Sequence, residues 1–216
     1  MMKTGCLIIG GGPAGLTAAC FFGPGAVLAD RLPQVGRKLL ATGGGRCNLT
    51  HETGADGIME AFGRNARFMR PALSGFPPAA VRAFFSRLGV ATLADDDGCV
   101  FPVSRRASDV AGALERAARA AGAEIRCGTR VLRLLTEKLP GDAAGRRCVT
   151  AVETESGLLR PAAVILAAGG QSYPDLGSDG SGFRLARQAG LEVVQPVPAL
   201  AGLVTREEWP KTLGGI

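Results

Sequence analysis

The chain has 216 residues, of which 46% are hydrophobic and only 20% are charged, so it can bury a sizeable core and is not a disordered protein. Its formal net charge of +6 is typical of proteins that bind nucleic acid, but the basic residues are scattered along the chain. One Trp and one Tyr provide no platform on which bases could stack. We therefore expect a small-molecule substrate and no nucleic-acid partner.

Six cysteines are spread along the chain without any C-x-x-C pair, and His51 is the single histidine. This pattern supports neither a zinc site nor an iron–sulfur cluster. No apolar run approaches the ~18 residues that a membrane span requires. The sequence therefore predicts a protein that has no metal and no membrane partner and works in the reduced cytoplasm.

A strand, a glycine turn and a helix open the chain. Residues 6–9 are an apolar run, residues 10–15 read GGGPAG, and an alanine-rich helix follows. In this G-x-G-x-x-G arrangement Gly10 permits the tight turn, Gly12 lets a pyrophosphate approach the backbone, and Gly15 lets the helix pack on the strand. The pattern predicts a dinucleotide site, and a glycine-rich turn without a ligand is the alternative.

An aspartate, Asp30, directly follows the second expected strand. The stretch Gly-Pro-Gly at 23–25 should end the first helix near Phe22, and the apolar residues 26–29 should form a returning strand. Asp30 follows twenty residues after Gly10, where a dinucleotide site places a carboxylate that accepts both ribose hydroxyls. The alternative is that Asp30 is only a turn residue ahead of Arg31-Leu32-Pro33.

A second glycine-rich segment runs from residue 36 to 48 and contains three consecutive glycines, 43–45. Such a run loses much conformational entropy on folding, so a rigid ligand pressed against the backbone explains it better than a linker. Arg37, Lys38 and Arg46 are placed to meet phosphate charge, and the glycine amides are placed to line a ring system. A flexible loop is the alternative.

The middle of the chain predicts helices and one hairpin. Apolar residues have helical spacing between 55 and 90, residues 90–103 form a hairpin that turns through the acidic stretch 95–97, and Ser108-Asp109 should cap a further helix. Three adjacent carboxylates in a turn do not converge on one point. The acidic stretch therefore does not predict a metal site.

The last third predicts strands around a sheet edge. Segments 123–134, 148–153 and 158–160 should form a small antiparallel meander that hangs on a parallel sheet. Residues 162–170 should form a buried strand whose small residues end where a ligand crosses the sheet. A short helix over 183–189 follows.

Four motifs together resemble a known family. In chain order, GGGPAGLTAA, GRKLLATGGGRCNLT, FPVSRRASDV and LAAGGQSYPDLGSDGSGF resemble the BaiN/YhiN-type flavoproteins, which are NAD(P)/FAD-dependent, aminoacetone-oxidase-like enzymes. The resemblance implies a glutathione-reductase-like, Rossmann-type α/β domain for FAD over residues 1–195, with a parallel sheet and a small antiparallel meander. Residues 196–216 would then begin an inserted substrate domain, inside which the chain stops.

The same resemblance implies roles for individual residues. The FAD pyrophosphate would be held by Gly10, Gly12, Pro13, Ala14 and Gly15. The adenosine ribose would be held by Asp30, with Arg31 beside it. The flavin half would be held by Gly36, Arg37, Lys38, Thr42, Gly43 and Gly44. Val131 would contact adenine through its backbone, and Ala168 and Gly169 would close over the phosphates. No catalytic residue is implied.

The resulting hypothesis is an FAD-dependent oxidoreductase whose flavin is reduced by NAD(P)H and reoxidised by a small unsaturated or carbonyl-containing molecule, or by oxygen. Three alternatives stay open: an incomplete FAD-binding module without turnover of its own, an NAD-linked dehydrogenase that uses only the first glycine loop, and a flavin-dependent RNA-modifying enzyme. Cys47 lacks a C-x-x-C partner and is expected to be structural. The sequence leaves the oligomeric state open.

Overall fold

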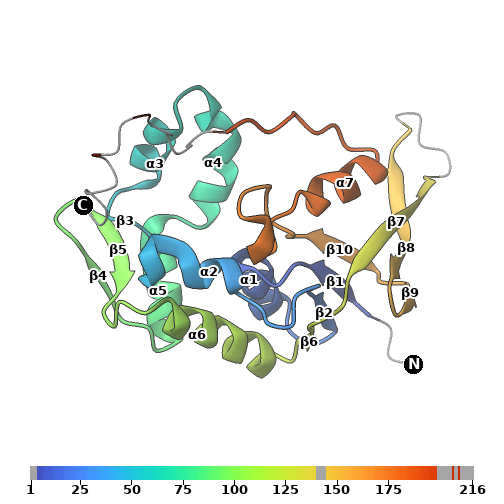
Figure 1. Ribbon diagram of the computed structural model, residues 1–216, viewed down its shortest axis with the longest axis horizontal. Coiled ribbons are helices and arrows are strands. Elements are labelled where there is room, and N and C mark those ends of the chain that lie inside the picture. The colour runs from blue at the N-terminus through green and yellow to red at the C-terminus, as the bar shows by residue number, and fades with distance from the viewer. Residues whose placement is uncertain (1–3, 140–144, 199–205, 207–208, 210–216) are drawn as a thin grey trace.

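The computed structural model describes residues 4–139, 145–198, 206 and 209. Its centre is a parallel sheet of four strands, β1 Cys6–Ile9, β2 Ala26–Ala29, β6 Glu124–Arg126 and β10 Ala163–Leu166, in the order β10-β1-β2-β6 (Figure 1). The register pairs Ile8 with Leu28 in β2 and with Ile165 in β10. The predicted Rossmann-type α/β fold is confirmed.

The first strand, loop and helix follow the predicted pattern. All residues of β1 and β2 are buried, because both faces of the sheet are covered. Helix α1, Pro13–Phe22, starts with a proline, whose fixed φ suits the first helical turn. It ends at Gly23, whose φ of 73° is a conformation that favours glycine, so the predicted end near Phe22 is confirmed.

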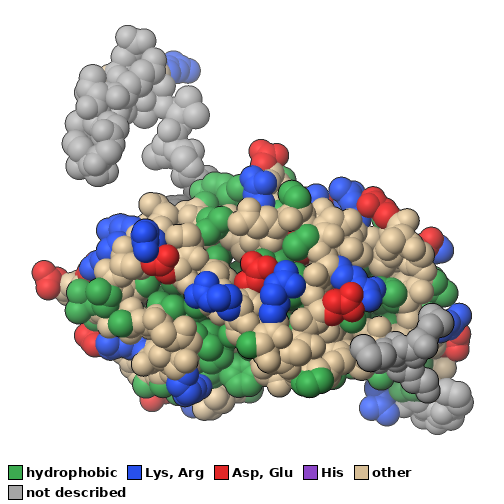
Figure 2. Space-filling view, turned by 90° about the horizontal axis from the view of Figure 1, so that it is seen from below, with side chains coloured by type: hydrophobic (Ala, Val, Ile, Leu, Met, Phe, Trp, Pro, Cys, Tyr) green, Lys and Arg blue, Asp and Glu red, His purple; other side chains and the backbone are tan. Residues whose placement is uncertain are grey.

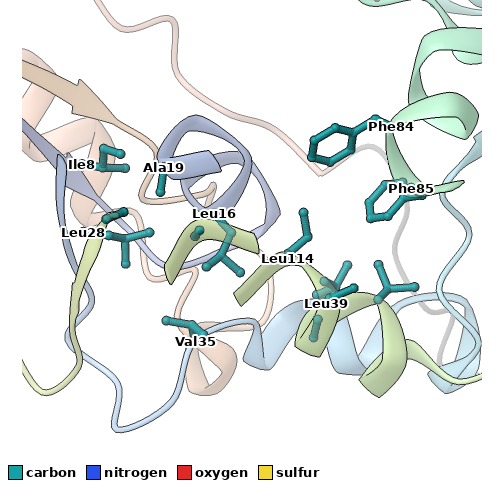
Figure 3. Packing of buried hydrophobic residues seen from close by; sticks show 14 of the residues in the cluster. Ile8, Leu16, Ala19, Leu28, Val35, Leu39, Phe84, Phe85 and Leu114 are labelled. Carbon is teal, nitrogen blue, oxygen red and sulfur yellow. The ribbon is translucent and has the colours of Figure 1, made fainter. Parts of the chain in front are cut away.

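Helices cover one face of the sheet and enclose the larger core. They are α1, α2 Arg37–Ala41, α5 Pro78–Arg87 and α6 Ala107–Ala120. Ile8 and Leu28 point from the sheet into a cluster with Leu16 of α1 and Leu114 of α6 (Figure 3). Since side chains alternate along a strand, Leu7 and Ile9 point to the other face.

The opposite face carries a second, smaller core beneath an antiparallel sheet. This sheet contains β7 Val131–Lys138, β8 Arg147–Thr154 and β9 Gly157–Leu159, and helix α7, Ser181–Gln188, packs beside it. Leu134, Val152 and Leu185 meet the sheet there. The predicted meander is confirmed from β7 onward. Its predicted first segment is wrong, because 124–126 pairs in parallel with β2 and belongs to the central sheet.

A third sheet and three further helical segments form the part at the left of Figure 1. The sheet contains β3 Thr50–His51, β4 Thr92–Ala94 and β5 Cys99–Pro102. The helical segments are α3 Ala55–Phe62, the short 3-10 turn η2 Gly63–Asn65 and α4 Ala66–Gly75. Strands β4 and β5 form the predicted hairpin, and its turn is closed by the Gly98 amide, which donates to the Asp95 carbonyl.

Three local expectations need correction. Strand β10 is not buried: it lies at the edge of the sheet, where Ile165 is 36% exposed. Helix α6 begins at Ala107 with Arg106 as its N-cap, so Ser108 and Asp109 lie inside the first turn and do not cap it. Helix α7 begins at Ser181, two residues before the predicted start.

The predicted beginning of an inserted domain over 196–216 falls almost wholly outside the described residues. The division at residue 195 therefore stays a prediction.

Candidate functional site

The first glycine loop lies at the carboxyl end of β1, and the space around Gly12 differs from that around Gly10 and Gly15. Gly10 has φ +110°, and a Cβ there would lie 2.4 Å from the Ala167 carbonyl oxygen. A Cβ on Gly15 would lie 1.9 Å from the Gly10 carbonyl oxygen. Gly12 has no atom within 4 Å of a Cβ, so it faces open space. Gly10 and Gly15 are thus required by packing, whereas only a ligand would require Gly12.

The N-terminus of α1 behind this loop is suited to an anion. Its N-cap Gly12 offers no side chain to the helix, and its first turn contains no acidic residue. The first amides of a helix lack partners within it, and they carry the positive end of the helix dipole. Pro13 and Ala14 are exposed beside Gly12. A pyrophosphate placed there would meet open backbone and a favourable field.

Asp30 ends β2 and is fixed against the loop. The Gly11 amide donates to its Oδ2 at 2.5 Å, and the Leu32 amide donates to its Oδ1 at 2.7 Å. Asp30 therefore makes the turn contact that the alternative interpretation predicted. A carboxylate offers about four acceptor positions, so these two bonds leave capacity for ribose hydroxyls.

A cleft of about 150 Å³ opens between the carboxyl ends of β1 and β2, strand β7 and helix α7. Five of the residues singled out from the sequence line it: Gly10, Asp30, Arg31, Val131 and Ala168. They come from four separate stretches of the chain. The fold therefore brings together residues expected at the adenosine half and at the pyrophosphate of one dinucleotide.

Two charged residues in the cleft wall were missed by sequence reasoning. Asp179 lies 3.5 Å from the Arg31 guanidinium and 3.9 Å from that of Arg184. Burial alone would raise the pKa of Asp179, but hydrogen bonds from Ser181 and the charge of Arg31 outweigh it and hold that pKa below its ordinary value. No local pattern in the sequence connects residues 31 and 179, so only the fold could reveal this pair.

The second glycine segment is joined to the first loop but lies outside the cleft wall. The Gly36 amide donates to the Gly11 carbonyl at 2.8 Å, and Gly36 itself has φ +73°. Lys38 donates to Ser178 at 3.1 Å and to Ser172 at 3.4 Å, which ties α2 to the segment after β10. The predicted residues that do not line the cleft are Gly12, Pro13, Ala14, Gly15, Gly36, Arg37, Lys38, Thr42, Gly43, Gly44 and Gly169.

The three consecutive glycines form a short 3-10 segment, η1 Thr42–Gly45, in which Gly43 and Gly44 are left-handed with φ of 56° and 63°. The Thr42 hydroxyl donates to the Leu39 carbonyl at 2.6 Å and closes the end of α2. Gly44 has open space where a Cβ would be. The segment therefore forms a compact turn whose backbone is exposed at Gly43 and Gly44.

Cys47 follows this turn with φ +63° and is buried. Burial raises the pKa of its thiol, although a hydrogen bond with Thr42 acts in the opposite direction. A thiol that stays protonated is a poor nucleophile. The described residues contain no group of three or more His, Cys, Asp or Glu side chains arranged to hold a metal ion.

Basic side chains do not form a continuous surface on the face shown in Figure 2. Lys and Arg alternate there with Asp and Glu, separated by polar and apolar atoms. Many arginines have acidic partners, such as Arg119 with Glu115 and Arg126 with Glu124. Among the described residues, no helix is long and apolar enough to cross a membrane.

Comparisons with known proteins agree with this architecture. The sequence pattern of the HI0933-like protein Rossmann domain matches residues 4–216. The chain is similar to the 3-dehydro-bile acid delta(4,6)-reductase of Clostridium scindens, with 37% identity over 219 residues that cover 96% of this chain and 49% of that protein. It is also 29% identical to the ribosomal RNA dihydrouridine synthase of Escherichia coli over 210 residues, which cover 94% of this chain and 48% of that one. The chain thus spans about half the length of the curated relatives it matches.

Solved structures share the fold at low sequence identity. The THI4 protein of Thermovibrio ammonificans matches with a TM-score of 0.56 and 16% identity, over 88% of this chain and 64% of that chain. The open conformation of a flavocytochrome c3 fumarate reductase matches with a TM-score of 0.56 and 20% identity, over 87% of this chain and 40% of that chain. At such identities the likeness concerns the fold alone.

Proposed function

The chain belongs to the HI0933-like family of Rossmann-domain proteins, and from this membership we propose that it forms the FAD-binding part of a flavin-dependent reductase. The expected family resemblance is confirmed. The observation that carries the proposal is the cleft at the carboxyl ends of β1 and β2, where Asp30 and Gly10 face Val131. An uncapped helix N-terminus stands beside it, behind Gly12.

The residues of this chain fit a dinucleotide. The open position at Gly12 and the amides that follow it would hold the pyrophosphate, and Asp30 would accept hydrogen bonds from the ribose. Val131 of β7 and Ala168, two residues after β10, both line the cleft. Val131 would contact the adenine, and Ala168 would close over the phosphates. The ordered turn at Gly43 and Gly44 would lie along the flavin half. When bound, FAD supplies the hydride and electron transfer that no protein side chain provides.

The proposed substrate is a small molecule with an unsaturated or carbonyl-conjugated group, and the proposed electron donor is NAD(P)H. The similar protein from Clostridium scindens is named a delta(4,6)-reductase of a 3-dehydro-bile acid, which supports this class of chemistry. We also propose a small-molecule substrate over a macromolecular one, because the face in Figure 2 mixes both signs of charge. The same proposal includes oxygen as an alternative acceptor of electrons from the reduced flavin.

Reduction of uridine in RNA is the second candidate. It is favoured by the similarity to two ribosomal RNA dihydrouridine synthases, at 27% and 29% identity. Making dihydrouridine also means reducing a carbon–carbon double bond next to a carbonyl group, so the two candidates differ in substrate and not in the type of reaction. The higher identity to the bile acid reductase, 37%, favours the small-molecule candidate.

The test is to purify the complete product of the gene, denature it and identify the released cofactor. We expect FAD at close to one equivalent. Release of NAD, or a folded protein that releases nothing, would contradict the proposal. Consumption of NADH and NADPH should then be followed with an enone and with unmodified ribosomal RNA as alternative acceptors. Turnover with ribosomal RNA, and none with the enone, would support the second candidate.

A further inference from the structure

One aromatic ring beside the three-glycine turn is enclosed by two guanidinium groups. Phe101 of β5 is 5% exposed, and the Arg46 and Arg105 guanidinium carbons lie 5.0 Å and 4.8 Å from its ring centroid. A Cβ on Gly43 would lie 3.2 Å from the edge of the same ring. The ring therefore connects the hairpin to the glycine turn and holds both cations in place.

The two arginines differ in charge compensation. Arg105 donates to both oxygens of Asp95, with Nη1 to Oδ2 at 2.8 Å. Its backbone has a left-handed φ of 54°, which a residue other than glycine seldom adopts. The hydrogen bonds from Arg105 hold the pKa of Asp95 below its ordinary value, so that carboxylate stays ionised and neutralises Arg105. Arg105 is thus committed to a structural pair.

Arg46 forms no such ion pair, although its charge also contributes to lowering the pKa of Asp95. In the part of the chain that the structure describes, no carboxylate lies within 4.0 Å of its guanidinium nitrogens, and its Nε donates to the Gly43 carbonyl at 3.1 Å. Of the five N–H donors of an arginine, the four on the Nη atoms remain. The side chain is exposed but oriented by the ring and by this hydrogen bond. A fixed planar fork of donors is suited to a carboxylate or phosphate.

We propose that Arg46 is the residue that binds an anionic oxygen of the substrate, a carboxylate or a phosphate, next to the glycine turn. This inference rests on the proposed function, because that function places the flavin half along the same turn. Phe101 is then a positioning residue, which keeps the guanidinium oriented before the substrate arrives. Arg105, held by Asp95, contacts the same ring.

The experiment uses the complete gene product, labelled with ¹⁵N and carrying whatever cofactor it retains. Acetate and methyl phosphate are titrated separately, and the backbone amides of Gly44 and Gly45 report binding by NMR. We expect a saturable shift with at least one anion and a Kd at least about tenfold weaker in Arg46→Gln, because a charge-assisted hydrogen bond is lost. Arg46→Lys, which keeps the charge without the fork, should bind with intermediate affinity.

Arg119→Gln is the matched control, since it removes the same charge from an exposed pair with Glu115 on α6; its Kd should equal that of the wild type. Phe101→Leu should weaken binding although Arg46 is retained. Tighter binding of acetate would indicate a carboxylate substrate, and tighter binding of methyl phosphate a phosphorylated one. Equal affinity in Arg46→Gln and the wild type, or no saturable shift with either anion, would overturn the proposal. If anions bind through Arg46 but no flavin is released on denaturation, the proposed function fails and the anion site stands.

Discussion

Gly12→Val separates the fold from cofactor binding, and Gly54 provides a control with nearly identical geometry. Both glycines are helix N-caps with extended backbone, at φ −75°, ψ −178° for Gly12 and φ −79°, ψ 176° for Gly54. Neither has an atom within 4 Å of a Cβ. They differ in position: Gly12 precedes α1 at the proposed pyrophosphate site, whereas Gly54 precedes α3.

The expected effect on stability is small and equal at the two positions. Valine is a poorer N-cap than glycine by about 1 kcal/mol, and the loss of backbone freedom in the unfolded chain offsets this by about 0.4–1 kcal/mol. A net loss of at most about 1 kcal/mol lowers Tm by about 2–4 °C in a protein of this size. The effect on flavin should be large only at Gly12. There the branched side chain occupies the space of the phosphate, and loss of a single charge-assisted hydrogen bond already weakens binding about tenfold.

The assay compares thermal unfolding with the flavin absorbance of purified, denatured protein. Gly12→Val should fold normally and contain little flavin, whereas Gly54→Val should retain the wild-type content. If Gly12→Val retained as much flavin as Gly54→Val, the assignment of the pyrophosphate to this helix N-terminus would be refuted. If Gly12→Val failed to fold while Gly54→Val folded, the conclusion that a side chain fits at Gly12 would be contradicted.

Other predictions concern the residues that stabilise the fold around the site. Gly15→Ala should destabilise the fold by about 1–3 kcal/mol in urea, because its Cβ would lie 1.9 Å from the Gly10 carbonyl oxygen; unchanged unfolding would contradict the packing role. Leu114→Ala, at 0% exposure between α6 and the sheet, should lose about 2–5 kcal/mol in the same experiment. Asp95→Asn should lower Tm at neutral pH. Arg105 lowers the pKa of Asp95 in the folded state. The ion pair therefore contributes its full stability above the unfolded-state pKa of about 3.9, and this stability is lost as the pH falls through the folded-state pKa. The Tm difference from wild type should therefore shrink below about pH 4, and a constant difference would count against the pair.

The N-terminal unit could be predicted because its determinants are local. A buried run, a turn that only glycine permits and a helix stop lie within 20 consecutive residues, and the structure reproduces them as β1, Gly10 and α1. The position of Asp30 follows from the same reasoning, since a short crossover fixes the spacing between two neighbouring parallel strands. Here the sequence also left the turn role open, and Asp30 makes that contact as well.

Strand partners were harder to predict, because pairing depends on residues far away in the chain. Segment 124–126 resembled the meander that follows it, yet it pairs with β2 across about a hundred residues. Residues 163–166 are apolar enough for a central strand, yet they lie at the sheet edge. Composition shows how apolar a strand is, but it does not show which other strands pair with it.

By itself, then, the sequence determined the glycine turn between β1 and α1, the carboxylate after β2 and a turn at the second glycine segment. All three rest on backbone conformations and spacings that neighbouring residues impose. Tertiary structure alone decided that Val131 and Ala168 face Asp30 across one cleft, that Asp179 pairs with Arg31, and that Phe101 orients Arg46. These contacts join segments that are separated by tens of residues or more. Their distances are set by how the sheets and helices pack, and no local pattern encodes them.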